Sequence, residues 1–319
     1  MSLLQTRAMA NAKHQPPLEM APHAVRAHIA SLRSVPGERQ LTSAPHGHIL
    51  TNVGVWSPDG EWIVYDTRSD PAGASFDGRT IEMVHTFTGE VRTLYRSQHG
   101  ACCGVATFHP RHMQAAFILG PEHPDAHWQY GPARRRGVLV DAAHPGTAIA
   151  LDGRDLTPPF TPGALRGGTH VHVFSADGLW ISFTYEDHIL ELLYAKQGRS
   201  AANPRNIGVS VAGQPVSVPR THPRNHDGEY FSVLVTETTD RPRPGSDEIS
   251  RACEEAWIGI NGYMRPDGVW QRRALAFQGT VAGATGRSLV EAFVVDLPDD
   301  LTQPGKRPLE GTPEMLPVP

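Results

Sequence analysis

Histidine is the residue type in this chain whose number and spacing most readily suggest chemistry. There are 17 histidines, and His170 and His172 stand two residues apart in an apolar segment that ends at Phe174. Residues two apart in a β-strand project from the same face, so we expect these imidazoles to project together. Aligning the repeated segments of the chain on their turns places His222 at the position of His172, on a neighbouring repeat. Three converging imidazoles suit Mn²⁺, Fe²⁺ or Zn²⁺, so these histidines are the predicted metal ligands.

Two arginines and one acid–base pair are further candidates for catalysis. Arg166 and Arg220 are expected either to bind a carboxylate or to abstract a proton. The pair Asp187-His188 follows an apolar segment and supplies groups suited to general base catalysis. A structural interpretation stands beside this one, because His-x-His is a common pattern on strands and the same histidines would then serve packing and hydrogen bonding.

A long loop and a predicted helix carry the remaining candidates, which we interpret as a ligand or partner surface. Loops between strands often carry binding residues, and residues 121–136 combine aromatic and basic side chains. The candidates are His123, His127, Trp128, Tyr130, Arg135, Glu248 and Glu255. The two glutamates fall in or beside a predicted short helix over 247–256, as an acidic cluster or as its solvated face. The loop is alternatively a covered edge between sheets.

Repeated strand–turn–strand segments position these residues. Each begins with a strand that ends in an aromatic residue, continues with a tight turn and returns in an alternating apolar strand. The copies span residues 55–65, 107–110, 173–183 and, more weakly, 224–235. Repeats at intervals that fit blades of about 40–50 residues with loop insertions are typical of a β-propeller. An all-β propeller is therefore the predicted fold, and a β-sandwich of recurrent hairpins is the alternative.

The repeats divide the chain into three predicted regions. Residues 1–38 form an N-terminal extension, partly disordered or with a short helix. Residues 39–297 hold about four to five blades, with a helical insertion near 245–262 and the strand around Phe231 in the fourth blade. Residues 298–319 are a proline-rich linker or tail. Because so few blades leave strand edges unpaired, we expect an incomplete ring whose remaining blades lie elsewhere.

Composition and charge exclude several classes of protein. The net charge of −4 gives no electrostatic footprint for nucleic acid. Three cysteines, two of them adjacent, form neither a disulfide framework nor a paired zinc motif, which favours reduced thiols in the cytoplasm. No apolar run is long enough for a transmembrane helix, and the N-terminus lacks the apolar core of a secretory signal. We therefore expect a cytoplasmic protein with no membrane span and no nucleic-acid partner.

Three segments, in order along the chain, resemble an uncharacterised bacterial family of TolB-like β-propellers that are often labelled biopolymer transporters. The segments are residues 48–52, 165–175 and 244–249, and the resemblance extends over about residues 40–319. It implies a propeller that lacks the C-terminal blades of the family. It implies no established activity.

Two functions follow as hypotheses. The first is a binding or scaffold module for a protein partner or a small polar ligand, because the repeats come without a recognisable catalytic constellation. The second is a metal-dependent lyase or hydrolase acting on an acidic saccharide, with the metal held by His170, His172 and His222. This second site would be similar to that of the oligogalacturonate lyases, which are propellers with histidine ligands from neighbouring blades.

Overall fold

The computed structural model describes residues 37–198 and 204–302. It separates the chain into two units, Met1–Ser43 and Ala44–Pro319. Of the first unit only residues 37–43 are described, and they form neither helix nor strand. Nearly all of the predicted N-terminal extension and most of the predicted C-terminal tail therefore lie outside the described residues.

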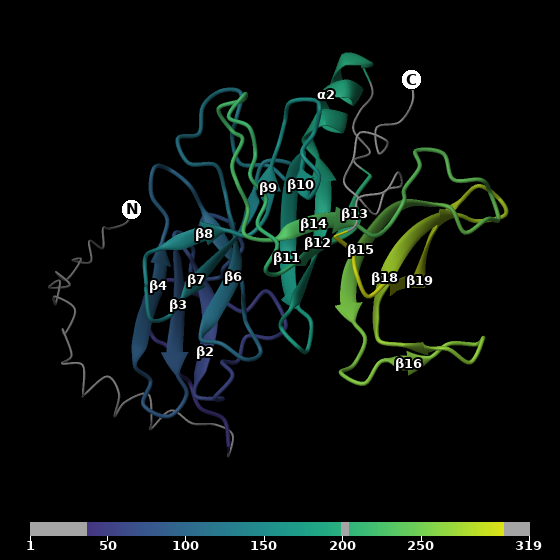
Figure 1. The fold of residues 1–319 in the computed structure, drawn as a ribbon. Helices are drawn as coiled ribbons and strands as arrows, with labels where there is room; N and C mark the ends of the chain where they lie inside the picture. Colours follow the sequence, from purple (N-terminus) through teal and green to yellow (C-terminus); the bar gives the residue numbers. More distant parts are fainter. Residues whose placement is uncertain (1–36, 199–203, 303–319) are drawn as a thin grey trace, which may run out of the picture. The chain divides into compact units, whose positions relative to one another are not determined.

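The described part of the second unit contains four antiparallel sheets of three or four strands, which follow one another in chain order (Figure 1). The first sheet consists of β1 (Gly47–Ile49), β2 (Trp62–Arg68), β3 (Thr80–His85) and β4 (Val91–Arg96). The second consists of β5 (Cys103–Phe108), β6 (Gln114–Leu119), β7 (Arg136–Asp141) and β8 (Ala148–Ala150). Antiparallel sheets of consecutive strands that are repeated along the chain are typical of propeller blades. The predicted all-β propeller fold is confirmed, and the four sheets are called blades one to four below.

The third and fourth blades correct the predicted boundaries. Blade three consists of β11 (Gly167–Phe174), β12 (Trp180–Asp187), β13 (Asn206–Val211) and β14 (Phe231–Leu234). The strand at Phe231 thus closes blade three, and its prediction as part of blade four is wrong. In the described residues blade four is built from β15 (Ile249–Trp257), β18 (Arg273–Ala282) and β19 (Ser288–Leu297).

Strand β15 occupies the segment predicted as a helix, and that prediction is also wrong. The buried residues of β15 include Ile249, Ala252 and Glu255, which are spaced three apart. An amphipathic helix produces a similar spacing. Here it arises because β15 shifts its register against β18 after Ile249 and again after Cys253. Each bulge adds a residue and delays the alternation of the strand, so the strand acquires a period close to that of a helix.

Smaller elements lie in the connections. β9 (Gly153–Arg154) pairs in parallel with β10 (Ala164–Leu165), and β16 (Tyr263–Met264) pairs with β17 (Trp270–Gln271). Helix α2 (His188–Lys196) follows β12 directly. In the part of the chain that the structure describes, no helix combines the length and the hydropathy needed to cross a membrane.

The tight turns expected from the repeats are present and recur in detail. The Ser57 hydroxyl accepts a hydrogen bond from the amide five residues later at 2.9 Å, and the Ser175 hydroxyl does the same at 3.1 Å. Gly60 and Gly178, in the same two turns, have φ angles of 73° and 74°. Glycine tolerates a positive φ because it has no Cβ, so the local sequence determines both turns.

Consecutive blades pack their apolar faces together. Blades one and two share a core that includes Val64, Met83, Phe108, Phe117 and Val140. A smaller cluster of Ala116, Leu139, Phe174 and Ile181 joins blades two and three. Blades three and four share Val209, Val233, Ile249, Leu275 and Phe277. Burial of apolar area contributes about 25 cal/mol per Å². This burial stabilises the packing of each blade against the next one along the chain.

The first strands of blades two, three and four, called inner strands below, each contain a bulge with a left-handed residue. These residues are Val105, Val171 and Glu254, with φ angles of 60°, 56° and 57°. In each case the register against the neighbouring strand shifts at this point. A β-branched residue is a rare outlier in this region, and such a conformation costs on the order of 1–3 kcal/mol. The surrounding contacts must stabilise it.

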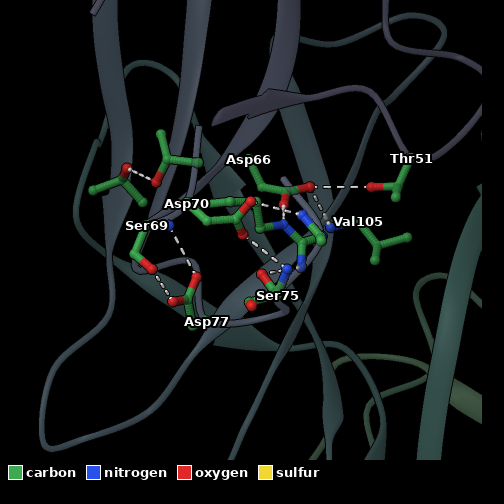
Figure 2. Close-up of polar contacts among 11 residues, drawn as sticks. Thr51, Asp66, Ser69, Asp70, Ser75, Asp77 and Val105 are labelled. Carbon is green, nitrogen blue, oxygen red and sulfur yellow. Dashed lines mark hydrogen bonds and ion pairs between the residues drawn. The ribbon is translucent and has the colours of Figure 1, made fainter. Parts of the chain in front are cut away.

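The Asp66 carboxylate, on β2, stabilises the bulge in β5 (Figure 2). Asp66 Oδ1 accepts hydrogen bonds from the Val105 amide at 2.9 Å and from the Thr51 hydroxyl at 3.1 Å. Its Oδ2 lies 2.8 Å from Arg68 Nε, and both side chains of this ion pair are buried. One carboxylate therefore ties the strained amide of blade two to blade one.

Two carboxylates, Asp70 and Asp77, organise the loop that follows β2, as Figure 2 also shows. Asp70 accepts from the Ser75 amide at 2.9 Å, and Asp77 accepts from the Ser69 amide at 3.0 Å. The loop carries Phe76, whose ring centroid lies 4.4 Å from the Arg68 guanidinium carbon. The Asp66–Arg68 pair is in this way covered by an aromatic ring.

We expect Asp66→Ala to lower the free energy of unfolding by about 3–5 kcal/mol, because it leaves the buried Arg68 without its ion-pair partner and the Val105 amide without its acceptor. Urea unfolding measures the change. Asp66→Asn keeps an acceptor and should lose less. Glu90→Ala, which removes an exposed partner of Arg92, should change stability far less, because exposed ion pairs contribute little. Equal losses for Asp66→Ala and Glu90→Ala would contradict the role given to Asp66.

Candidate functional site

Hydrogen bonds between blades bring the inner strands together. Asn52, in the segment that leads into the first turn of blade one, donates to Thr107 Oγ1 at 2.6 Å and to the His172 carbonyl at 3.2 Å. This amide therefore connects blade one to blades two and three. Trp257 Nε1 donates to the Val173 carbonyl at 2.9 Å and ties blade four to blade three. The residues that follow the bulges are held by these contacts.

One register position is equivalent in the four blades. It lies two residues before the aromatic residue that ends each inner segment, and it holds Gly54, Ala106, His172 and Glu255. In blades two, three and four it directly follows the left-handed residue of the bulge. Its side chain is buried in all three, with exposures of 3%, 0% and 6%. Two of the four blades place a small residue here, and two bury an ionisable one.

His172 is enclosed between β11 and β7. Neither ring nitrogen has a hydrogen-bond partner in the described protein. A Cβ added to Gly137 would lie 2.5 Å from His172 Nε2 and 2.8 Å from Asp152 Oδ1, so only glycine leaves room for the imidazole. Burial, with a smaller contribution from Arg135, lowers the pKa of His172 to about 3. The ring is therefore neutral at neutral pH.

Glu255 is the second buried ionisable group at this position. Both carboxyl oxygens lack a hydrogen-bond partner among the described residues. Burial raises the pKa of Glu255 to about 8; the charge of Glu254 adds to the shift, and Arg205 opposes it. At neutral pH the group is largely a neutral carboxylic acid, which can donate one hydrogen bond and accept others.

Positive charge gathers beside these two neutral groups. Arg135 is buried, and its Nε donates to the Thr169 carbonyl at 3.1 Å. Arg205, at the start of β13, donates from Nε to Glu186 Oε1 at 2.8 Å. The half-buried His170 feels both arginines: burial first, then Arg135, His172 and Arg205 lower the pKa of His170 to about 2. A neutral imidazole thus stands in a positive electrostatic potential.

The described contacts do not bring the three predicted metal ligands together. The bulge after His170 interrupts the alternation of β11, so His170 is half-buried whereas His172 is fully buried. His222 lies in a loop before β14, with its ring centroid 6.4 Å from that of Trp128. The alignment that paired it with His172 took this loop for an inner strand; β15 has that place, and Glu255 is the equivalent of His172.

Metal binding consequently stays a prediction from the sequence alone. Among residues 37–198 and 204–302, no group of three His, Cys, Asp or Glu side chains is arranged to hold an ion.

The four predicted catalytic candidates make structural contacts. Arg166 is fully buried, and its Nε and Nη2 donate to Asp187 Oδ2 at 3.0 and 2.5 Å. The other oxygen of Asp187 accepts from an amide of α2 and caps this helix, of which His188 is the first residue. Arg220 is exposed and pairs with Asp227 at 2.7 Å. Catalytic roles for these residues remain predictions without a shared site.

The predicted ligand surface separates into different environments. Trp128 is buried, with the guanidinium carbons of Arg134, Arg154 and Arg224 at 5.6–5.7 Å from its ring. The other loop residues are His123, whose carbonyl accepts from Arg224, the exposed His127, and Tyr130, which stacks on Phe76 at 5.1 Å. Glu248 is paired with Arg243 at 2.8 Å. Of this set, Arg135 and Glu255 lie with His170 and His172, and the Tyr130 hydroxyl interacts with Arg135.

Three residues of the site were not predicted from the sequence: Asp152, Glu186 and Arg205. Every residue of β12 is buried, so a charged Glu186 near its end was a usable signal for a buried pair. Arg205 carried no such signal, because its place beside Glu186 depends on the pairing of β12 with β13. Asp152 is brought towards His172 by the hydrogen bonds that its Oδ1 accepts from the Gly137 amide at 2.9 Å and from the Thr169 hydroxyl at 3.3 Å.

The four blades define a propeller-type protein. Its candidate binding site combines the buried ionisable residues His172 and Glu255 with Arg135 and Arg205. The model of a family described as a protein of unknown function (DUF3748) matches residues 102–226. The chain is 45% identical over 284 residues to the uncharacterized protein YidR of Escherichia coli (strain K12). The alignment covers 88% of this chain and 63% of YidR, so the chain spans less than two thirds of that relative.

Among solved structures, TolB from Acinetobacter baumannii matches with 12% identity and a TM-score of 0.35. The match covers 78% of this chain and 43% of TolB. A score this low supports no inference about function.

We expect Glu255→Gln to flatten the dependence of stability on pH between about 5 and 8. The pKa of Glu255 is about 8 in the folded protein against a usual value of 4.5, so the folded state binds more protons in this window. Its contribution to stability then falls as the pH rises. Urea unfolding at several pH values measures the slope. Glu291→Gln, on an exposed position of β19, is the control, and an unchanged slope for Glu255→Gln would contradict the assignment.

We expect Gly137→Ala to destabilise the fold by about 1–3 kcal/mol, as overpacking of a filled interior does. The added Cβ meets His172 Nε2 at 2.5 Å. The double variant Gly137→Ala, His172→Ala should recover part of the loss, because the imidazole is then absent. Additive losses in thermal or urea unfolding would show that the two residues do not share this space.

Proposed function

We propose that this protein is a binding module that takes a small anionic ligand beside the inner strands of blades two to four. The observation that carries the proposal is the environment of Arg135. Its guanidinium is buried, donates to a main-chain carbonyl and interacts with the Tyr130 hydroxyl, and the carboxylate whose charge acts on it, Glu186, is ion-paired with Arg205. Two guanidinium groups therefore share one carboxylate, and burying the excess positive charge costs several kcal/mol. An anion bound nearby would reduce that penalty.

The neighbouring groups support an anion rather than a cation. The lowered pKa values of His170 and His172 have Arg135 as a cause after burial, so a positive charge in this region is disfavoured. Arg205 is partly accessible, with 19% of its side chain exposed. It can turn from Glu186 towards a ligand, whereas Arg135 is fixed by its surroundings. Half-buried His170 offers a ring nitrogen between the two.

The proposal keeps the broader expectations from the sequence. A protein partner that uses the propeller as a scaffold, a cytoplasmic location and further blades outside this chain all remain compatible with it. The ligand site needs only blades two, three and four, and every residue proposed to contact the ligand lies within residues 135–255.

A thermal-shift screen of the full chain tests the proposal. Small carboxylates and phosphate monoesters should raise the midpoint of unfolding, whereas neutral analogues of the same size should not. A ligand at 100 times its Kd stabilises by about 2.7 kcal/mol, which corresponds to a few degrees for a domain of this size. Added salt should weaken the shift, because it screens partly exposed charges.

Two variants separate the site from the rest of the surface. Arg205→Gln should reduce the affinity for the anion at least fivefold in isothermal titration, and Arg135→Gln should reduce it further. Arg220→Gln removes an exposed arginine with its own partner and should bind as the wild type does. If all three variants bind an anion equally well, the proposed site is wrong.

A further inference from the structure

The proposed anion site has a second, uncharged half, formed by His172 and Glu255. Both residues are at least nine-tenths buried, and none of their four polar side-chain atoms has a hydrogen-bond partner among the described residues. Buried polar groups in proteins are nearly always hydrogen-bonded. His172 and Glu255 are exceptions to this rule, and they occupy the same register position on consecutive inner strands.

The two blades that complete this position leave it unfilled by bulky side chains. Gly54 and Ala106 stand where blades three and four have His172 and Glu255. A Cβ on Gly54 would meet only the Thr107 methyl group within 4 Å, at 3.1 Å. The four equivalent positions thus combine two small residues with two polar ones. If this position served apolar packing alone, Val or Ile would suffice, as at other positions of these strands.

The protonation states decide which ligand groups fit this half. His172 is a neutral imidazole with one donor and one acceptor, and Glu255 is largely a neutral carboxylic acid with one donor and further acceptor capacity. A ligand hydroxyl also donates one hydrogen bond and accepts others, so it can pair with either side chain. A second anion gains less here, because neither group carries a positive charge.

Arg205 connects the neutral half to the charged half. Its charge acts on Glu255 and on His170 alike, so both lie within electrostatic range of one guanidinium. Arg135 acts on His170 and on His172. Hydrogen bonds also place both arginines against inner strands: Arg135 donates to the Thr169 carbonyl of β11 at 3.1 Å, and the Arg205 carbonyl accepts from the Ala252 amide of β15 at 2.7 Å.

We propose that the ligand is a hydroxylated carboxylic acid, whose carboxylate lies beside Arg135, Arg205 and His170 and whose hydroxyl groups are recognised by His172 and Glu255. This inference rests on the proposed anion site and adds the class of ligand to it. It also assigns His172 and Glu255 as uncharged groups that position the ligand. Glu255 acts in its protonated form, and binding should accordingly weaken above about pH 8.

Isothermal titration of the full chain with three matched probes tests the inference at pH 6.5. Gluconate carries a carboxylate and hydroxyls, hexanoate carries the carboxylate alone, and sorbitol carries hydroxyls alone. Gluconate should bind about tenfold more tightly than hexanoate, because each added hydrogen bond contributes a factor of several. Sorbitol should bind more weakly than either.

Variants at the neutral half sharpen the test. Glu255→Leu should reduce the preference for gluconate over hexanoate, because His172 alone then recognises the hydroxyl groups, and it should leave the affinity for hexanoate unchanged. Glu255→Gln keeps a neutral donor and acceptor, so it should retain the preference for gluconate and extend it above pH 8. The unfolding midpoint of each variant shows whether it is folded, and Glu291→Gln serves as a matched surface control.

The outcomes distinguish this inference from the anion site on which it rests. Equal binding of gluconate and hexanoate to the wild type would overturn the inference and leave the anion site standing. Sorbitol binding as tight as gluconate, or no binding of either acid, would overturn the anion site itself. Loss of hexanoate binding in a folded Glu255→Leu protein would show that Glu255 belongs to the charged half, which also contradicts the inference.

Discussion

The left-handed residue in the inner strands is the constraint on which the candidate site depends. Val105, Val171 and Glu254 adopt a conformation that costs on the order of 1–3 kcal/mol each. Each bulge reverses the expected alternation and buries the next residue of the strand, which is Ala106, His172 or Glu255. An unbroken strand would have given these side chains a different face. The burial of a histidine and a glutamate is therefore a consequence of backbone geometry, and the contacts that hold the bulges, such as that of Asp66 with the Val105 amide, support the site indirectly.

Between blades two and three, buried charge is held mostly by the main chain. Arg154 donates to the carbonyls of Gly167 and Arg135, and Arg135 donates to that of Thr169. Carbonyl dipoles neutralise a guanidinium only in part, so positive potential persists in this junction and lowers the pKa of nearby histidines. Burial raises the pKa of Asp152, and the charge of Arg154 opposes this shift. This positive potential lowers the stability of the folded protein, and it makes the region between blades two and three suited to binding an anion. The segment that matches the family of unknown function, residues 102–226, contains this junction but not Glu255.

Local sequence predicted the blades where turn chemistry and alternation agreed. The turns at Gly60 and Gly178 and the strands that follow them lie where the repeats placed them. The prediction failed at β15, because two bulges gave a strand the spacing of a helix, and at residues 220–224, because a loop was aligned with an inner strand. Both errors moved the partner of His172 from Glu255 to His222. Arg205 and Asp152 were missed since their roles depend on which strands pair and on where Gly137 leaves space.

The sequence by itself determined the class of fold, because an aromatic residue, a Ser-x-Asp-Gly turn and an alternating strand are local features that hold wherever the blade lies. It also singled out His170, His172, Arg135 and Glu255, although for different roles. The tertiary structure alone decided that these residues belong together and that His222 and Trp128 do not belong with them. The physical reason is that bulge position and packing between blades are set by contacts such as those of Asn52 and Trp257, which join residues 55 to 120 positions apart. Burial then decides protonation, and His172, which looks like a metal ligand in the sequence, becomes a neutral, enclosed imidazole without a hydrogen-bond partner among the described residues.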